Sequence, residues 1–287
     1  MRLGIRLLES KEDVDFAVGL TVEEGWNYTA KEIGLMLELD PEGSFIYEDG
    51  KERLGFVTAV TYSRTGVIGH LIVTETARRR KIGDALVREA VEYMRGKGAE
   101  SMMLYATAEG SKLYERHGFT PRDEVLCVHL KLEKGRLRRK PAACKPITSK
   151  DLDEIVSIDR ELFEDDRSRL LKAIYGRSSK SAFKIDRGNG IEGYIFARPD
   201  HVGHDLGPWA CLSGSPDDAE DLFTTALSTI GEGILYTGTF AGNAEAERIF
   251  RTLPIARSWI IPMMIQGKSR YGSAADRVFA IAAFELG

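Results

Sequence analysis

The chain has 287 residues, of which 43% are hydrophobic and 29% charged, and it carries a net charge of −4. This is the composition of an ordinary globular protein, and its mild acidity argues against a general nucleic-acid or membrane-surface binder. At usual domain sizes the length predicts two domains of about 140 residues each. We therefore expect neither a nucleic-acid nor a membrane partner.

No apolar run reaches the roughly eighteen residues of a membrane-spanning helix. The N-terminal stretch, MRLGIRLLESKEDVD, carries acidic residues too early for a secretory signal. Cys127, Cys144 and Cys211 are scattered and form no Cys-x-x-Cys pair, which favours reduced thiols over a disulfide framework or a zinc site. We expect a cytoplasmic protein without a bound metal.

Two helices are expected near the N-terminus. The residues from Ser10 onward resemble a helix start, and Gly25 breaks the helix that follows. Thr29 is followed three residues later by Glu32, which is the spacing of a capping box. This spacing predicts a second helix that runs to about Leu39.

Strands precede and follow these helices, at residues 5–8, 44–48, 54–62 and 67–73. The last three are joined by two short turns, Glu48 to Lys51 and Arg64 to Gly66, whose composition is typical of hairpins. We therefore expect these three strands to form an antiparallel meander.

The last of these strands leads into a turn suited to an anion. Residues Arg78 to Lys81 are four consecutive cations, and a helical pattern begins at Ile82. A helix N-terminus presents unpaired backbone N–H groups and the positive end of the helix dipole, so this turn is suited to hold a pyrophosphate. Gly83 has no Cβ and lets the backbone approach that ligand closely.

Two motifs carry a family resemblance. The segment Val73-x-x-x-x-Arg78-x-x-Lys81-Ile82-Gly83-x-x-Leu86 resembles the acyl-CoA signature of the GNAT N-acetyltransferase superfamily, Arg/Gln-x-x-Gly-x-Gly/Ala. Downstream, Leu113-Tyr114-Glu115-Arg116-His117-Gly118-Phe119 resembles the family's Leu-Tyr-Glu-x-x-Gly-Phe block. The resemblance implies an α/β (α+β) fold in which helices flank a mixed, mostly antiparallel sheet. Lys81 departs from the signature, since it stands where the first glycine is usual. Its side chain would either crowd the pyrophosphate or add a charge contact.

The resemblance also implies the ligand and its site. Acetyl-CoA would be the acyl donor, with its pantetheine arm paired to the backbone of the 67–73 strand. The implied cofactor-binding residues are Leu71, Ile72, Val73, Arg78, Arg79, Arg80, Lys81, Ile82, Gly83 and Asp84. Trp26 and Tyr28, in the loop between the first two helices, would border the acceptor. Alternatively, Trp26 fills the space between those helices.

The implied chemistry needs a proton donor and a proton acceptor. Tyr114 would give the departing thiolate its proton, because a phenol stays protonated at neutral pH; alternatively, it only packs its helix onto the sheet. Strand alternation places His70 on the face of Ile68 and Ile72, so the alternative to a catalytic His70 is a histidine packed in the core. The resemblance also implies that ordered water can take the proton from the amine, so that no single base is needed. The candidate bases are Glu24, Tyr62, His70 and Glu75.

The rest of the first domain is expected to be a strand at 101–107, a short helix at 109–116 and a strand at 125–132 that closes the domain. Residues 134–146 combine cations, prolines and a glycine, which predicts an exposed linker. The expected domains are therefore residues 1–133 and 147–287.

The second half repeats the first in outline, with helix and strand patterns at 151–163, 181–184, 193–195 and 235–238. The anion site is not repeated. A helix that begins at Pro216 carries Asp217 and Asp218 in its first turn, and these acids would repel a pyrophosphate. The segment that corresponds to the Leu-Tyr-Glu-x-x-Gly-Phe block has changed as well. We expect a GNAT-like accessory domain without a CoA motif, which completes the acceptor pocket or serves as an interface.

Taken with the resemblance, these patterns predict an acetyl-CoA-dependent N-acetyltransferase. Its acceptor would be the primary amine of a small molecule or an amino-acid-like molecule, which would attack the acetyl group directly in a ternary complex. The alternative is a non-catalytic acyl-CoA-binding sensor or scaffold. Either protein could form a homodimer.

Overall fold

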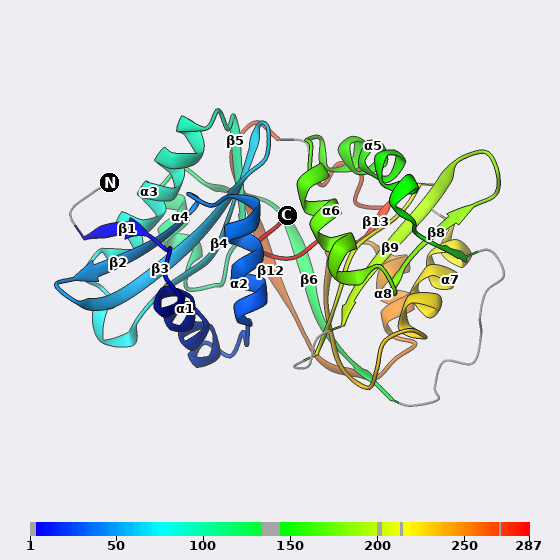
Figure 1. Cartoon of the computed structure of the whole chain (residues 1–287), viewed down its shortest axis with the longest axis horizontal. Coiled ribbons are helices and arrows are strands. Elements are labelled where there is room, and N and C mark those ends of the chain that lie inside the picture. Colours follow the sequence, from blue (N-terminus) through cyan, green and yellow to red (C-terminus); the bar gives the residue numbers. More distant parts are fainter. Residues whose placement is uncertain (1–3, 134–143, 200–202, 213–214, 270) are drawn as a thin grey trace. The chain divides into compact units, whose positions relative to one another are not determined.

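The computed structural model describes residues 4–133, 144–199, 203–212, 215–269 and 271–287. The chain forms two compact units, each assembled from separate stretches of sequence (Figure 1). The first unit contains Met1–Arg122, Pro262–Ser269 and Glu285–Gly287, and the second contains Asp123–Ile261 and Arg270–Phe284. The last part of the chain therefore contributes to both units.

The first unit is built on a sheet with the strand order β1-β2-β3-β4-β5-β12. These strands are β1 (Ile5–Leu7), β2 (Ser44–Asp49), β3 (Glu52–Thr61), β4 (Thr65–Val73), β5 (Ser101–Tyr105) and the end of β12 (Ile255–Gly267). β1 to β4 pair antiparallel, and β5 runs parallel to β4. The hairpin turns predicted the antiparallel meander of β2, β3 and β4, but not the pairing of β1. The helices are α1 (Lys11–Glu23), α2 (Ala30–Leu39), α3 (Ile82–Gly96) and α4 (Ser111–Arg116), with a 3-10 turn, η1, at Glu75–Ala77.

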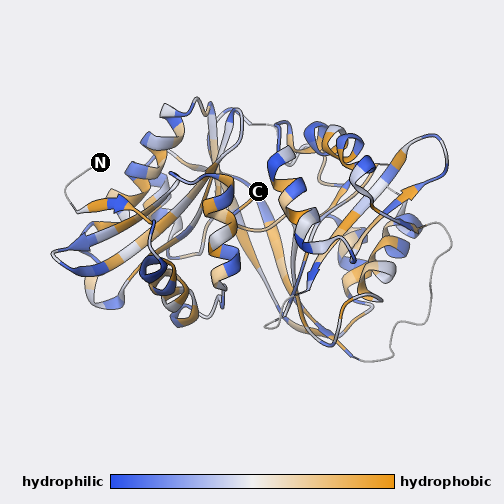
Figure 2. Cartoon of the chain, in the orientation of Figure 1, coloured by the Kyte–Doolittle hydropathy of each residue, from blue (hydrophilic) through white to orange (hydrophobic). Residues whose placement is uncertain are grey.

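Helices cover both faces of this sheet. On one face, Leu20 of α1 and Ile33 of α2 pack against Phe56 of β3. On the other face, Leu86 and neighbouring residues of α3 pack against Val57. Adjacent residues of β3 thus point in opposite directions, as strand geometry requires. Figure 2 shows largely hydrophobic strands and helices that carry both colours, because each helix buries one face only.

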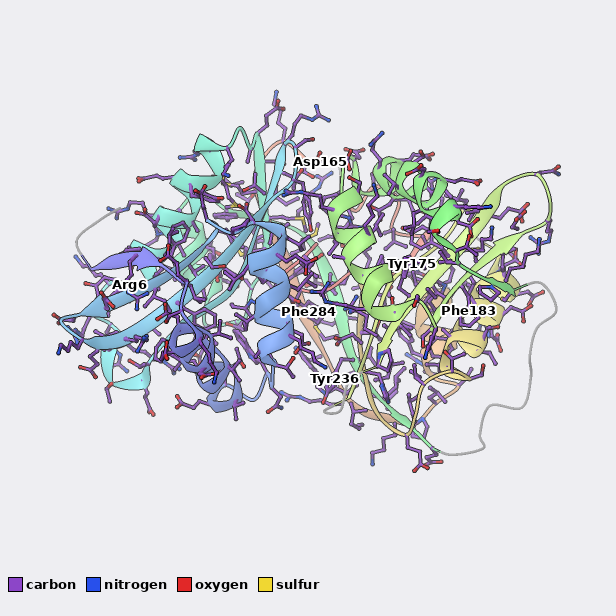
Figure 3. All side chains as sticks on the ribbon, viewed as in Figure 1. Arg6, Asp165, Tyr175, Phe183, Tyr236 and Phe284 are labelled. Carbon is purple, nitrogen blue, oxygen red and sulfur yellow. The ribbon has the colours of Figure 1, made fainter. Side chains whose placement is uncertain are left out.

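The start of α1 is held by a cluster of charges. Ser10 caps the helix together with Asp13, as the sequence predicted. The Arg6 guanidinium, labelled in Figure 3, donates to the Asp13 carboxylate at 2.7 Å and to Glu48 at 2.7 Å. Arg53 also donates to the Asp13 carboxylate, at 2.7 Å. The hydrogen bonds from Arg6 and, to a lesser extent, Arg53 hold the pKa of the Asp13 carboxyl well below its usual range.

The second unit repeats this topology, in the strand order β7-β8-β9-β10-β11-β6. Its strands are β7 (Cys144–Pro146), β8 (Ala182–Asp186), β9 (Ile191–Pro199), β10 (His204–Cys211), β11 (Gly233–Phe240), part of β6 (Thr120–Leu132), and β13 (Val278–Ala280), which pairs with β10. Its helices are α5 (Leu152–Phe163), α6 (Ser168–Ser178), α7 (Pro216–Leu227) and α8 (Ala244–Phe250), with a 3-10 turn, η2, at Ser149–Asp151. The expected internal repeat is therefore present.

The two halves exchange a strand, which the sequence did not predict. The strand at 125–132, expected to close the first domain, instead pairs with β11 in the second unit, where Val125 lies opposite Phe240. The position beside β5 is taken by β12, whose residues Met263 to Gly267 pair antiparallel with β5. Both strands are apolar, so their pattern alone could not decide the partner.

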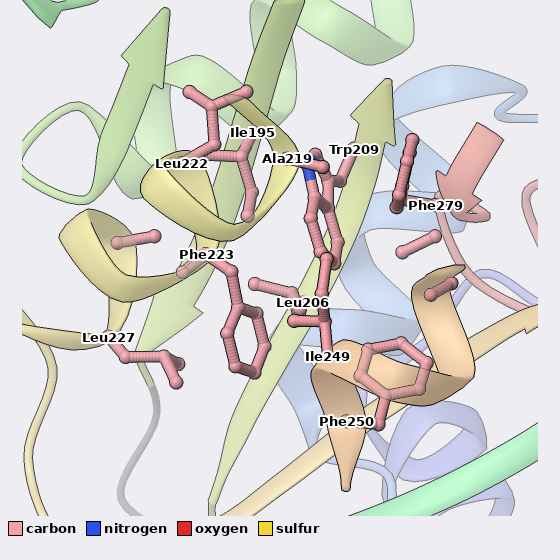
Figure 4. Close-up of a cluster of buried hydrophobic side chains, with 14 of the residues drawn as sticks. Ile195, Leu206, Trp209, Ala219, Leu222, Phe223, Leu227, Ile249, Phe250 and Phe279 are labelled. Carbon is pink, nitrogen blue, oxygen red and sulfur yellow. The ribbon is translucent and has the colours of Figure 1, made fainter. Parts of the chain in front are cut away.

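An aromatic cluster forms the core of the second unit (Figure 4). The Trp209 ring stacks on Phe223, with 5.5 Å between ring centroids, and lies 4.9 Å from Phe279 and 6.3 Å from Phe250. Trp209 is therefore a core residue of this unit.

Several smaller expectations can now be compared with the structure. Residues 134–143 of the predicted linker lie outside the described residues, and its last three residues form β7. Cys127, Cys144 and Cys211 are free thiols. Among the described helices, none is long and apolar enough to cross a membrane.

Candidate functional site

The turn between η1 and α3 has an unusual backbone. Arg79 has a φ of 65° and Lys81 a φ of 63°, both in the left-handed region that favours glycine. The position of Lys81 therefore demands a positive φ, which explains why a glycine is usual there in the resembled signature.

The N-terminus of α3 carries no side-chain cap. Lys81 is its N-cap residue and makes no capping hydrogen bond through its side chain. The first N–H groups of a helix lack partners within the helix, and they carry the positive end of its dipole. Helix α7 of the second unit differs, because Ser215 accepts a hydrogen bond from the Asp218 N–H. The start of α3 is therefore the better anion site of the two.

Two arginines of this turn lie at the surface and form ion pairs with exposed or partly exposed carboxylates. Arg78 donates to the Val73 carbonyl oxygen at 3.3 Å and pairs with Glu24, and Arg80 lies 3.2 Å from Asp49. Both arginine side chains are about half exposed, at 46% and 51%. Exposed ion pairs of this kind contribute little to stability, so a phosphate can replace the carboxylates at small cost.

The two motifs meet at the start of α3. A Cβ on Gly83 would lie 3.3 Å from Leu113 Cδ2, which belongs to the second motif. The Asp84 carboxylate lies 3.2 Å from Arg116 and 3.3 Å from His117 of the same motif. The structure thus brings together residues that the sequence separates by α3 and β5.

The other predicted cofactor residues divide by exposure. Ile72 and Ile82 are buried at 4% and 2%, so only their backbone atoms could reach a ligand. Leu71 and Val73 are partly buried against the α3 side of the sheet. Within the described residues, β4 pairs with β5 only from Thr65 to Val67. The remainder of β4 therefore has no β5 partner, as the resemblance implies for a strand that receives pantetheine.

Tyr114 lies on α4 with its side chain buried. Its ring packs edge-on against Phe119, 6.0 Å between centroids, and it is 8% exposed. Burial raises the pKa of its phenol above the ordinary tyrosine value. The side chain therefore packs α4 onto the sheet and also keeps its proton, so packing and proton donation are compatible.

A bulge in β4 overturns one expectation about His70. Thr58 of β3 lies opposite Gly69, but Phe56 lies opposite Ile72, so β4 carries one extra residue between the two pairs. His70 has a φ of 48° at this bulge. Ile68 packs with α3, whereas Ile72 packs with α1 and α2. The prediction that both isoleucines share the face of His70 was wrong, because the bulge shifts the alternation by one residue.

His70 is buried on the α1 and α2 side of the sheet. Its Nδ1 lies 2.9 Å from Thr58 Oγ1, and its ring is edge-on to Tyr28 with 4.2 Å between centroids. Within the described structure, its Nε2 is buried and has no hydrogen-bond partner. Burial lowers the pKa of His70 to about 3. The imidazole is therefore neutral at physiological pH and a weak base, which argues against His70 as the proton acceptor.

A carboxylate from the C-terminus completes this region. The Tyr28 hydroxyl donates to Glu285 Oε2 at 2.7 Å, although the two residues are 257 positions apart. Glu285 is 5% exposed, and no sequence pattern indicated that it joins the first unit. The Tyr62 hydroxyl donates to the Leu286 carbonyl oxygen at 2.8 Å, so it too contacts this segment.

Trp26 is 38% exposed in the loop after α1. This exposure argues against a side chain that fills the space between α1 and α2. Of the other candidate bases, Glu24 pairs with Arg78 at the surface, and Glu75 is exposed.

The equivalent region of the second unit is altered at three places. β10 has a bulge at the same topological position, between Leu206 and Trp209, but Pro208 stands there and has no backbone N–H. Within the residues that the structure describes, β10 pairs with β11 only at His204 and Asp205. β13 pairs with β10 beyond that point, and the Ile281 N–H donates to the Gly238 carbonyl oxygen of β11 at 2.9 Å. The opening between these strands is therefore filled by the protein's own chain. Finally, Asp217 and Asp218 lie in the first turn of α7.

Comparison with known families agrees with this duplicated topology. The model of the acetyltransferase (GNAT) family matches residues 12–119, and the model of an acetyltransferase (GNAT) domain matches residues 155–280. The chain belongs to the GNAT superfamily. It is a tandem GNAT acyltransferase, and the expected fold, with a mixed and mostly antiparallel sheet flanked by helices in each half, is confirmed.

Three relatives extend over nearly the whole chain. A holothin acyltransferase from Pseudoalteromonas sp. (strain SANK 73390) is 24% identical over 280 residues, which covers 93% of this chain and 88% of the relative. The crystal structure of a putative acetyltransferase from Pyrococcus horikoshii superimposes with a TM-score of 0.80 at 20% identity and covers 100% of this chain and 97% of its own. A tandem GNAT protein from the clavulanic acid biosynthesis pathway has a TM-score of 0.61 at 13% identity and covers 92% and 98%.

Proposed function

We propose that the first unit transfers an acetyl group from acetyl-CoA to the primary amine of a small-molecule or amino-acid-like acceptor, in a ternary complex. The observation that carries this proposal is the uncapped start of α3, which combines free N–H donors, the left-handed residues Arg79 and Lys81, and four exposed cations. This combination suits the pyrophosphate of CoA. The free cysteines fit a cytoplasmic setting.

Each part of the donor has a counterpart in the first unit. The backbone N–H groups at the start of α3, with Arg78 to Lys81, would hold the pyrophosphate, and residues 71–73 would pair with pantetheine. A backbone N–H of β4, at Val73 or its neighbour, would stabilise the developing charge on the thioester oxygen. Tyr114 would protonate the departing thiolate, and its raised pKa means that it holds that proton at neutral pH.

The acceptor class is supported by one relative's activity. Holothin acyltransferase, by its name, acylates holothin, and it matches both halves of this chain. A small-molecule acceptor is therefore the better proposal than a protein terminus. The second half, residues 147–287 with the strand exchange noted above, serves as an accessory domain without its own CoA site.

Isothermal titration with acetyl-CoA tests this proposal. The parent protein is expected to bind in the micromolar range, and the Arg78→Ala/Arg80→Ala variant to bind at least tenfold more weakly, or about 1.4 kcal/mol. Arg248→Ala/Arg251→Ala is the matched control, because it removes two exposed, ion-paired arginines from α8 and its C-cap. Equal affinities in all three proteins would contradict the proposed site.

Turnover separates the enzyme from the acyl-CoA sensor. Tyr114→Phe is expected to lower the rate of CoA release with an amine acceptor while leaving acetyl-CoA affinity unchanged, because the hydroxyl acts on the leaving group only. Tight acetyl-CoA binding without acetylation of any amine would favour the sensor. Unchanged turnover in Tyr114→Phe would remove Tyr114 from the mechanism.

A further inference from the structure

Strand β12 brings a polar side chain to the end of the helix that carries Tyr114. Gln266 of β12 belongs to the first unit and lies opposite Met102 of β5. Its amide Nε2 donates to the His117 carbonyl oxygen, and its Oε1 accepts from Arg95 Nη2 at 3.0 Å. These two partners fix the orientation of the amide, because its nitrogen meets an acceptor and its oxygen meets a donor.

The bonded carbonyl belongs to the turn that ends α4. His117 is the C-cap residue of this helix, and its N–H donates to the Tyr114 carbonyl oxygen at 2.9 Å. Gly118 follows with a φ of 82°, and the Phe119 N–H returns to the same Tyr114 carbonyl oxygen at 3.1 Å. A left-handed glycine is the usual way for a helix to end. The backbone of residues 117–119 therefore folds back onto the residue that carries the phenol.

This turn lies closely against β12. A Cβ on Gly118 would lie 3.2 Å from Gln266 Nε2, which is closer than most Cβ atoms come to a neighbour. The residue after the turn contacts the same strand, since Thr120 Oγ1 donates to the Ile265 carbonyl oxygen at 3.4 Å. A glycine at position 118 thus permits both the left-handed turn and the approach of the amide.

The turn in its place holds the Tyr114 ring. That ring packs edge-on against Phe119, with 6.0 Å between the centroids, and a Cβ on Gly110 would lie 3.2 Å from Tyr114 Cε2. Helix α4 has only six residues, and a helix of that length has little stability of its own. The contacts at its ends therefore determine where the phenol lies.

We infer that Gln266 is a positioning residue for Tyr114. Its amide holds the 117–119 turn against β12, and the turn holds the phenol where the departing thiolate takes its proton. A displacement of about 1 Å in such a group can cost about a hundredfold in rate. The inference rests on the proposed function, in which Tyr114 is the acid. It goes further, because the positioning residue arrives on the exchanged strand, far along the chain from the two motifs.

Two substitutions of similar length separate the two hydrogen bonds of the amide. Gln266→Glu can still accept from Arg95 but has no donor for the His117 carbonyl oxygen. Gln266→Lys keeps a donor for that oxygen but cannot accept from Arg95, which is exposed and can turn to solvent. The measurement is kcat of the full-length protein at saturating acetyl-CoA, with the best acceptor from a panel of small primary amines that includes benzylamine. We expect kcat to fall about tenfold or more in Gln266→Glu and less than about threefold in Gln266→Lys.

The affinity for acetyl-CoA separates positioning from a general disturbance of the unit. The proposed phosphate contacts come from the start of α3, and the hydrogen bonds of Gln266 do not involve them. The Kd of acetyl-CoA should therefore stay within about twofold of the parent value in both variants. Lys268→Ala, at an exposed position just beyond β12, should leave kcat unchanged. If Gln266→Glu does not fold, Gln266→Met removes the donor without adding a charge and should show the same fall in kcat.

A double-mutant comparison asks whether Gln266 acts through Tyr114. In a protein that already carries Tyr114→Phe, Gln266→Glu should lower kcat by less than about twofold, because no phenol remains to be positioned. The same factor in both backgrounds would overturn the inference, since it would show a role that is independent of the phenol.

The other outcomes separate the inference from the function beneath it. A parent-like kcat in Gln266→Glu, or an equal loss in Gln266→Lys, would overturn the role of the amide while the acetyltransferase stands. Unchanged turnover in Tyr114→Phe would overturn it as well, because there would be no acid to position. A parent protein that binds acetyl-CoA but acetylates no amine in the panel would overturn the proposed function, and the inference with it.

Discussion

His70 couples the stability of the first unit to pH. Burial lowers its pKa from 6.5 to about 3 in the folded protein, so below pH 6.5 the unfolded chain binds a proton that the folded chain does not. The free energy of unfolding therefore falls as pH falls through this window, by up to about 1.4 kcal/mol per pH unit from this residue. Above pH 6.5 the contribution is constant.

Urea unfolding of the parent protein and of His70→Gln, at pH 7, 6 and 5, isolates this contribution. The parent protein should lose stability more steeply than the variant as the solution is acidified, because only the parent has the imidazole to protonate. Parallel profiles would mean that His70 titrates near its ordinary pKa and is not buried in the way described.

At Lys81 the backbone explains what the motif alone could not. A φ of 63° is a conformation that glycine adopts freely and that costs other residues about 1–2 kcal/mol. Lys81 nevertheless adopts this conformation, and its side chain is exposed. The sequence raised the question of crowding, but φ and exposure could not be read from it.

At the scale of elements, the exchanged strand makes each half depend on the other part of the chain. Met102, Met103 and Leu104 of β5 are almost fully buried, and they pair with Met264 to Gln266 of β12. A fragment of residues 1–133 lacks β12 and would leave β5 as an apolar edge strand. Such edges promote aggregation.

We therefore expect fragment 1–133 to be poorly soluble and largely unfolded. Fusing residues 255–269 to that fragment through a flexible linker should restore a folded, soluble protein, because it returns the partner of β5. Circular dichroism and thermal unfolding of the two proteins provide the measurement. A fragment 1–133 that unfolds at the temperature of the intact chain would contradict the structural importance of the exchange.

Short sequence patterns predicted most helices and strands, but they did not predict which segments far apart in the sequence would pair. The capping residues Ser10 and Thr29 marked their helices correctly, and the Glu32 carboxylate does accept from the Thr29 N–H at 2.6 Å. These are contacts within four residues. The β4 bulge, the exchange of β6 with β12, and the arrival of Glu285 beside Tyr28 depend on segments far apart in sequence. Hydrophobic alternation carries no information about such partners.

At the scale of the whole molecule, one topology occurs twice and diverges at its binding elements. Both units have the bulged strand and the following helix, yet only α3 begins with an uncapped N-terminus and exposed cations. In the second unit Ser215 caps α7 and Arg187 pairs with Asp218 at 2.6 Å. The second unit thus keeps the fold but not these features of the helix start. The retained fold still supplies β12 to the other unit.

This divergence predicts the binding stoichiometry. Titration should give one acetyl-CoA per chain. In the second unit β13 pairs with β10, Pro208 lacks an N–H group, and the first turn of α7 contains two aspartates. Arg78→Ala/Arg80→Ala should weaken that single event as a whole. A stoichiometry near two, or a second site that persists in the variant, would require β13 to leave β10 on binding. In that case Phe284, labelled in Figure 3, would also have to move, since it contacts Gly238 so closely that a Cβ there would lie 2.8 Å from its ring.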